Sequence, residues 1–193
     1  MDRSRRFRWV ALVATVALIA VTVVVLFAAG FLATTHPSTA PAPLPRTFLN
    51  LTIVYDASTG IANYTAPFLS VVANTLVVVT ITNYDPTVSP LLVPWDNHVV
   101  GTVGGNETLN CGHGIEEVSS LPSTGISHTF TVFDAYYNVS IPIPPAPSVT
   151  VPCVVTFELT MDHEEITNWG CVVDCDNGQM AAGRMWGLLL IAA

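Results

Sequence analysis

The sequence predicts an all-β extracytoplasmic domain, a Greek-key β-sandwich or barrel, carried on a single N-terminal transmembrane helix. Three observations predict it. They are an uncharged apolar run near the N-terminus, a later series of short segments rich in β-branched and aromatic residues, and turn-forming residues between those segments. No stretch after the apolar run shows a sustained helical period. With 51% hydrophobic and 10% charged residues, the chain is too apolar to be disordered.

The apolar run covers residues 9–33 and contains no charged side chain. As a helix it would span roughly 37 Å, which is enough to cross a bilayer with some tilt. The preceding tail, residues 1–8, holds four of the six Arg and should stay in the cytoplasm. A cleaved signal peptide is the alternative. The run exceeds the usual h-region of about 7–15 residues, so we expect a retained single-pass anchor in the cell membrane.

Residues 34–45 form a Pro- and Thr-rich stretch that predicts an extended stalk. The stalk leads into a domain over residues 46–193, which lies outside the cytoplasm if the anchor is retained. This domain contains four N-x-S/T sequons, consistent with an exported glycoprotein. The candidate glycosylation sites are Asn50, Asn63, Asn106 and Asn138.

The predicted strands of the domain are defined by their near-alternating apolar pattern. The long ones cover 48–55, 75–83 and 149–160, and the shorter ones 98–103, 126–133, 166–173 and 185–191. Turn chemistry separates them: Asp-Pro at 85–86, Gly-Gly at 104–105, Ile-Pro-Ile-Pro-Pro at 141–145 and Asp-Asn-Gly at 176–178. This number of short strands in one domain is typical of a β-sandwich or a Greek-key barrel.

The domain is strongly acidic. The whole chain has 14 Asp and Glu against six Arg and no Lys, a net charge of −8. From residue 46 onward, 13 acidic residues stand against Arg46 and Arg184, a net charge of −11. Such a surface repels phosphate backbones, which excludes nucleic acid as a partner. It favours docking of a partner with a basic face.

Soft metal ligands follow one another in an informative order. His128 begins an alternating strand, and Cys171, Cys175 and Met185 follow on the loop between the last two predicted strands. Thiolate and thioether sulfurs select copper, and an imidazole completes the coordination. A loop held between rigid strands keeps such ligands in place.

On these residues the domain resembles the cupredoxin family, and within it the exported copper domain of cytochrome c oxidase subunit II. That family's pattern is an upstream His followed by Cys-x3-Cys-x3-His-x2-Met on the last loop. The resemblance implies one or two copper ions, with His128, Cys171 and Cys175 as ligands and electron transfer as the function. It also implies a haem-copper oxidase catalytic subunit as a partner.

The chain departs from the family pattern after Cys175. Gln179 stands where the family has His, and Ala182 where it has Met. The candidate thioethers are Met180 and Met185. We favour Met185, because a Met-x-Gly sequence leading into the last strand is how related loops end. Gln179 is a weaker candidate, since an axial Gln replaces Met in some blue-copper sites.

A second imidazole would complete a mononuclear site, but spacing does not select one. His98, His113 and His163 are each more typical of surface histidines. The cysteines also allow a copper-free interpretation, because an exported domain with four Cys suggests two disulfides. We expect Cys111 to pair with Cys153. Cys171 and Cys175 then either hold copper or form a second, short-range disulfide.

The sequence contains no nucleophile elbow, HExxH motif or phosphate-binding Gly loop, so no catalytic residues are predicted. We therefore expect a non-catalytic electron-transfer protein, or an accessory subunit of a terminal oxidase, with a basic-faced redox donor. The alternatives are a copper carrier and a copper-free, disulfide-stabilised cell-surface domain on the same scaffold.

Overall fold

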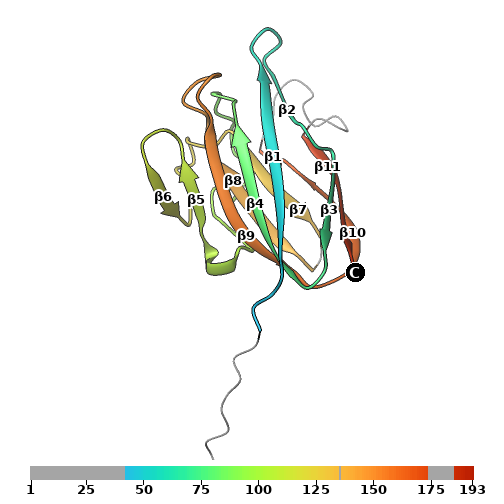
Figure 1. Ribbon diagram of the computed structural model, residues 1–193. Coiled ribbons are helices and arrows are strands. Elements are labelled where there is room, and N and C mark those ends of the chain that lie inside the picture. Colours follow the sequence, from blue (N-terminus) through green and yellow to red (C-terminus); the bar gives the residue numbers. More distant parts are fainter. Residues whose placement is uncertain (1–41, 135, 174–184) are drawn as a thin grey trace, which may run out of the picture. The chain divides into compact units, whose positions relative to one another are not determined.

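The computed structural model describes residues 42–134, 136–173 and 185–193, and they fold as two packed β-sheets (Figure 1). The predicted all-β sandwich is confirmed. The basic tail, the apolar run 9–33 and most of the stalk lie outside the described residues. Within the described part of the chain, no helix is long and apolar enough to span a membrane.

The first sheet has six strands in the order β2-β1-β4-β9-β5-β6. Its strands are β1 (Arg46–Asp56), β2 (Ile61–Tyr64), β4 (Thr75–Asn83), β5 (Glu107–Asn110), β6 (Ile115–Val118) and β9 (Cys153–Met161). The pair β1 and β4 is parallel, and the other neighbours are antiparallel.

The second sheet has five strands in the order β3-β11-β10-β7-β8. Its strands are β3 (Phe68–Val72), β7 (His128–Phe133), β8 (Asn138–Ile143), β10 (Glu165–Gly170) and β11 (Trp186–Ala192). Here β3 and β11 are parallel. A 3-10 turn, η1 (Val103–Gly105), precedes β5.

Strict alternation of burial explains why the long strands were predictable. In β4, every second side chain from Thr75 to Asn83 is buried and the others are half-buried. A period of two places one set of side chains between the sheets and the other set on the outer face. The interior set of β4 therefore defines the core.

Two sequence predictions are corrected by the structure. The strand predicted at 98–103 is not one: His98 and Val100 make only isolated bridges, to Ser120 and Ser140, and η1 follows. The proline-rich run 141–145, predicted as a turn, instead contributes to β8. Proline has no backbone N–H to donate to a neighbouring strand. Pro142 is tolerated because β8 is the last strand of its sheet, and on its outer side the described chain makes one isolated bridge, between Val100 and Ser140.

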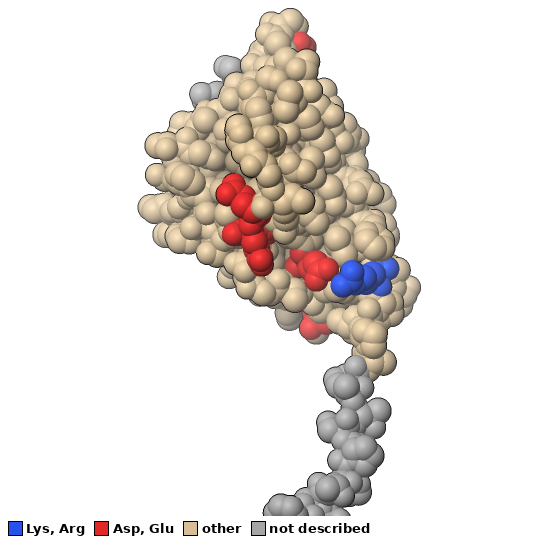
Figure 2. Space-filling view, turned by 60° about the vertical axis from the view of Figure 1, so that its left-hand side comes forward, with Lys and Arg blue, Asp and Glu red and all other residues tan. Residues whose placement is uncertain are grey.

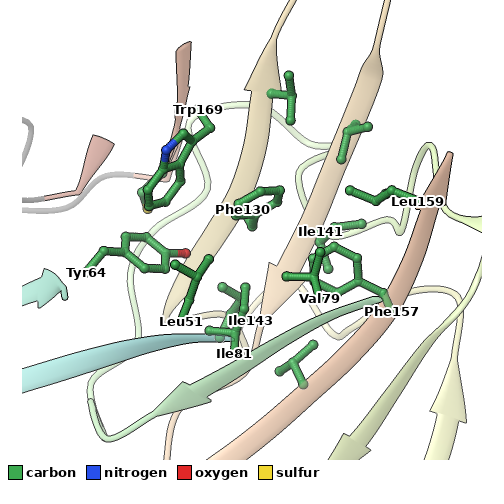
Figure 3. Close-up of a cluster of buried hydrophobic side chains, with 14 of the residues drawn as sticks. Leu51, Tyr64, Val79, Ile81, Phe130, Ile141, Ile143, Phe157, Leu159 and Trp169 are labelled. Carbon is green, nitrogen blue, oxygen red and sulfur yellow. The ribbon is translucent and has the colours of Figure 1, made fainter. Parts of the chain in front are cut away.

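Aromatic side chains fill the centre of the core (Figure 3). The Phe130 and Trp169 rings are stacked with centroids 5.4 Å apart, and Tyr64 meets Trp169 edge-on at 4.8 Å. Trp169 is fully buried and therefore belongs to the core. Since Phe130 and Trp169 stand two residues from His128 and Cys171, this packing fixes the strands that carry those two side chains.

The sandwich has two distinct ends. The chain enters at Arg46, which pairs with Leu76, and Ala192 lies nearby because its carbonyl accepts from Ala73 (Figure 1). The other end carries the start of β7 and the end of β10. These ends are separated by the length of β4, roughly 30 Å at about 3.3 Å per residue.

Charge is distributed unevenly over the described residues. Among them Arg46 is the one Lys or Arg, and it pairs with Glu158 at 3.5 Å. Figure 2 shows acidic side chains gathered on the same face as this arginine. The acidic surface predicted from composition is therefore present on the described part of the domain.

Candidate metal centre

Four residues with polar or sulfur-containing side chains come from different chain segments and lie at the end of the sandwich opposite Arg46. His128 is the first residue of β7, and Asp85 follows the end of β4. Cys171 follows the last residue of β10, and Met185 precedes the first residue of β11. All four are buried, with exposed fractions of 1% or less.

The central contact joins two predicted copper ligands. The Nδ1 atom of His128 lies 3.9 Å from the Sγ atom of Cys171, although the residues are 43 positions apart in the sequence. The antiparallel pairing of β7 with β10, in which Thr131 faces Gly170, brings them together. The upstream histidine and the first cysteine of the last loop are thus neighbours in the structure, and their role as copper ligands stays a prediction.

Thr129 ties the His128 and Cys171 segments to each other twice. Its backbone N–H donates to the Cys171 sulfur over 3.4 Å. Its side-chain hydroxyl oxygen accepts from the backbone N–H of Val172 over 2.8 Å. An N–H donor aimed at a buried sulfur favours the thiolate, which is the form of cysteine that binds metals.

Met185 is placed beside Cys171 by the backbone. The Cys171 N–H donates to the Met185 carbonyl over 2.8 Å, and the Met185 side chain is fully buried. The preferred thioether candidate therefore lies at the same end of the sandwich as His128 and Cys171. Cys175, Gln179 and Met180 lie outside the described residues, so the binuclear and mononuclear alternatives both remain predictions.

The remote nitrogen of His128 is occupied by a carboxylate. His128 Nε2 lies 2.8 Å from Asp85 Oδ2, and each side chain is 1% exposed. Burial alone would lower the pKa of His128, but the Asp85 carboxylate and the Cys171 sulfur raise it to about 9. Burial alone would likewise raise the pKa of Asp85, but hydrogen bonds from His128 and Thr87 outweigh it and lower that pKa.

A second carboxyl group, Asp96, lies in the segment between β4 and η1. It is 4% exposed and accepts from the Val93 N–H over 3.4 Å. Burial raises its pKa, and the nearby Cys171 sulfur raises it further. Asp96 is therefore a second buried carboxyl group that lies close enough to Cys171 for the two to interact electrostatically.

The structure does not bring a second imidazole to His128 from the other described histidines. His98, His113 and His163 are all exposed. His163 lies in the turn between β9 and β10, at the end of the sandwich opposite Cys171. Its ring faces Tyr136, and its backbone exchanges hydrogen bonds with the Tyr137 hydroxyl.

The predicted disulfide between Cys111 and Cys153 is present. It joins the end of β5 to the start of β9, next to Asn83, the residue that pairs with Cys153. The four sequon asparagines all lie on or beside strands of the outer surface, two of them exposed and two half-buried. Their glycosylation stays a prediction.

Sequence reasoning missed Asp85, because an Asp-Pro pair after a strand is a common turn signal. Its role depends on His128, which lies 43 residues further along the chain. One local signal was available: Asn83-x-Asp85 closes a strongly alternating strand with two buried polar residues. Buried polar side chains at a strand end need partners, so the pair could have marked a site.

The imidazole of His128 and the sulfur of Cys171 are close enough to bind the same soft metal ion. Bonds of about 2.0 Å to an imidazole nitrogen and about 2.3 Å to a thiolate sulfur can bridge 3.9 Å with a bend at the ion. Within the described residues, no group of three His, Cys, Asp or Glu side chains is arranged so that it could hold a metal ion. A complete site therefore needs Met185, whose thioether is a copper ligand, or a residue of the segment 174–184.

Comparison with known proteins gives distant structural matches alone. No protein-family profile and no curated protein matches the chain. A multicopper oxidase from Campylobacter jejuni is 11% identical over 80% of this chain, with a TM-score of 0.46, and the match covers 31% of its own length. Rusticyanin from Thiobacillus ferrooxidans is 12% identical over 75% of this chain and 77% of its own, with a TM-score of 0.38.

A heme-copper terminal oxidase dimer contains a chain that is 14% identical over 98% of this chain and 99% of its own, with a TM-score of 0.36. This chain spans about a third of the multicopper oxidase. These identities and TM-scores are too low to carry an argument about function. The interpretation of the site therefore rests on its own geometry.

Proposed function

We propose that this protein is a membrane-anchored, extracytoplasmic copper protein of the cupredoxin type that transfers electrons. The observation that supports it best is the buried contact between His128 Nδ1 and Cys171 Sγ, 3.9 Å apart, with Met185 on the adjoining backbone. Imidazole, thiolate and thioether together are the ligand set of electron-transfer copper sites. Bound copper would supply a one-electron redox change.

The residues of the chain perform three tasks in this proposal. His128 and Cys171 hold the ion, and the Thr129 N–H stabilises the thiolate between them. The packing of Trp169 and Phe130 behind these residues keeps their strands rigid, so little rearrangement accompanies a change of charge. Complete burial of Cys171 and Met185 excludes water from the sulfur ligands.

The position of the site within the domain fits electron exchange with an external donor. The chain enters at Arg46, one strand length away from His128. A tether formed by residues 9–45 would therefore attach at the end opposite the site. The acidic surface favours a donor with a basic face. A role beside a haem-copper catalytic subunit is the more specific form of the same proposal.

Asp85, His128 and Cys171 also follow one another in the order of an acid–base–thiol triad. In such triads the nucleophile must reach a substrate carbonyl. The Cys171 side chain is fully buried, which favours a bound ion over attack on a substrate. We therefore assign His128 and Cys171 to metal binding, with Asp85 at the remote nitrogen of His128.

The proposal is tested on the full chain purified in detergent. Thiols are counted after unfolding without reductant, copper is added to the folded protein, and visible absorption and electron paramagnetic resonance are recorded. We expect two thiols, those of Cys171 and Cys175, and an intense thiolate-to-copper band. The band should disappear in His128→Gln and persist in the control His113→Gln, which alters an exposed histidine.

The hyperfine pattern separates one copper ion from two. If no thiols are found and no colour develops, the protein is a copper-free domain with two disulfides. Copper binding without a reversible redox change would indicate a copper carrier. Either result would refute electron transfer.

A further inference from the structure

Asp85 makes a close polar contact with the candidate copper ligand His128. Its Oδ2 atom lies 2.8 Å from His128 Nε2, and both side chains are 1% exposed. An ionised carboxylate accepts hydrogen bonds and cannot donate them. His128 Nε2 must therefore carry a proton and donate it to Asp85, which leaves Nδ1 as the nitrogen that faces Cys171.

The other carboxylate oxygen is held in a fixed turn. Asp85 Oδ1 accepts from the Thr87 backbone N–H over 2.8 Å and from the Thr87 hydroxyl over 2.7 Å. The Asp85 N–H donates to Asn83 Oδ1 over 2.9 Å. Asn83 in turn donates to the Pro144 carbonyl over 2.9 Å, and the Asp85 carbonyl accepts from Ala146 over 2.8 Å.

These bonds leave Asp85 little freedom to rotate. Its Oδ1 atom accepts hydrogen bonds from Thr87, and its Oδ2 atom accepts the hydrogen bond from His128. The turn is anchored on both sides, by β4 through Asn83 and by the segment after β8 through Pro144 and Ala146. A carboxylate held in this way controls both the orientation of an imidazole and the position of its proton.

We propose that Asp85 is a positioning residue for the copper site: it fixes the proton of His128 on Nε2 and keeps Nδ1 aimed at Cys171 as a metal-binding nitrogen. This inference rests on the proposed copper function and names the residue on which the ligand histidine depends. The Asp85 carboxylate would also place a negative charge near the ion, which favours the more highly charged, oxidised form of the metal.

Asp85→Asn tests the proposal because an amide has a single acceptor oxygen. Thr87 offers two donors, so the Asn oxygen is expected to stay with Thr87 and turn its NH2 group toward His128. His128 Nε2 must then accept, and the ring proton moves to Nδ1, where it blocks the metal. Copper affinity should fall at least tenfold, the lower end of what loss of such an outer partner usually costs.

Asp56→Asn is a matched control. Asp56 holds the same kind of turn, because its Oδ1 accepts from the Ser58 N–H over 2.9 Å and from the Ser58 hydroxyl over 2.6 Å. It is exposed and makes no contact with a histidine in the described structure. The same chemical change there should leave copper affinity unchanged.

Two measurements on the full chain decide the matter. Above pH 9, where His128 of the metal-free protein holds a single ring proton, nitrogen-15 NMR should show that proton on Nε2 in the wild type and its absence from Nε2 in Asp85→Asn. Copper(I) affinity, measured by competition with a coloured chelator, should fall with the same variant. If His128 Nε2 carries no proton in the wild type, the proposal is overturned. This measurement does not depend on the folding of any variant.

A proton that stays on Nε2 in Asp85→Asn, or copper affinity that does not change, also overturns it. Failure of the proposed function looks different, because wild-type protein would then bind no copper, whatever the NMR spectra show. A purely structural role for Asp85 would lower stability in both Asp85→Asn and Asp85→Ala without moving the ring proton.

Discussion

Glu107, the first residue of β5, is the most unusual ionisable group in the described domain. Its side chain is 1% exposed, and neither carboxylate oxygen has a hydrogen-bond partner among the described residues. Burial raises the pKa of Glu107 from 4.5 to about 9. The carboxyl group is therefore uncharged at neutral pH in the folded protein, whereas the unfolded chain carries it as an anion.

The magnitude follows from proton linkage. The folded state holds one more proton than the unfolded state between pH 4.5 and about 9, so stability falls as pH rises through this window. Each pH unit costs about 1.4 kcal/mol, which amounts to about 3 kcal/mol between pH 4.5 and pH 7. Glu107→Gln keeps the size and the polarity of the side chain but removes the titration.

The assay is urea unfolding of the full chain in detergent, followed by tryptophan fluorescence at pH 5, 7 and 8.5. The stability difference between Glu107→Gln and wild type should grow in favour of the variant by about 1.4 kcal/mol per pH unit. Glu116→Gln, an exposed carboxylate on β6, should show no such trend. A pH-independent difference for Glu107→Gln would refute the reasoning.

Four further predictions concern the site and the core. Met185→Leu should keep copper bound but shift its reduction potential, measured by redox titration; loss of the metal would show that Met185 is more than a weak ligand. Replacing Cys111 and Cys153 by Ala opens a loop with a sequence separation of 42, and unfolding experiments should show a loss of about 4 kcal/mol. Trp169→Ala should cost about 3–5 kcal/mol and Trp169→Phe much less, because the indole N–H has no hydrogen-bond partner in the described part of the chain; equal losses would contradict this. In metal-free protein, the raised pKa of His128 stabilises the fold fully below pH 6.5, and this stability should be lost as pH rises through about 9, a trend that His128→Gln should remove.

The fold class could be predicted because strand alternation is a local property. The near-alternating apolar pattern of β4 predicts a strand, and burial alternates along the whole of that strand in the structure. Shorter strands such as β2 and β6 escaped prediction, since four residues at a sheet edge carry too little pattern. Pairing with a long neighbour, not intrinsic preference, makes these segments strands.

The candidate ligands could be proposed from the sequence because of their residue types, not because of a strand pattern. His128, Cys171 and Met185 are chemically soft or metal-binding residue types, so their order along the chain is informative without coordinates. The prediction at 98–103 failed because its apolar residues meet only isolated partners. Apolar composition alone does not provide the continuous neighbour that a strand requires.

By itself, the sequence determined the all-β class and the acidic surface, because both depend on composition or on local pattern. It also led us to expect the Cys111–Cys153 disulfide, which the structure contains, and it supplied His128, Cys171 and Met185 as candidate ligands. Tertiary structure alone decided that Asp85 binds the remote nitrogen of His128 and that Thr129 donates to Cys171. These contacts join segments about 40 residues apart, and their geometry depends on strand register. Register is set by the packing of the whole core, which no local stretch of sequence contains.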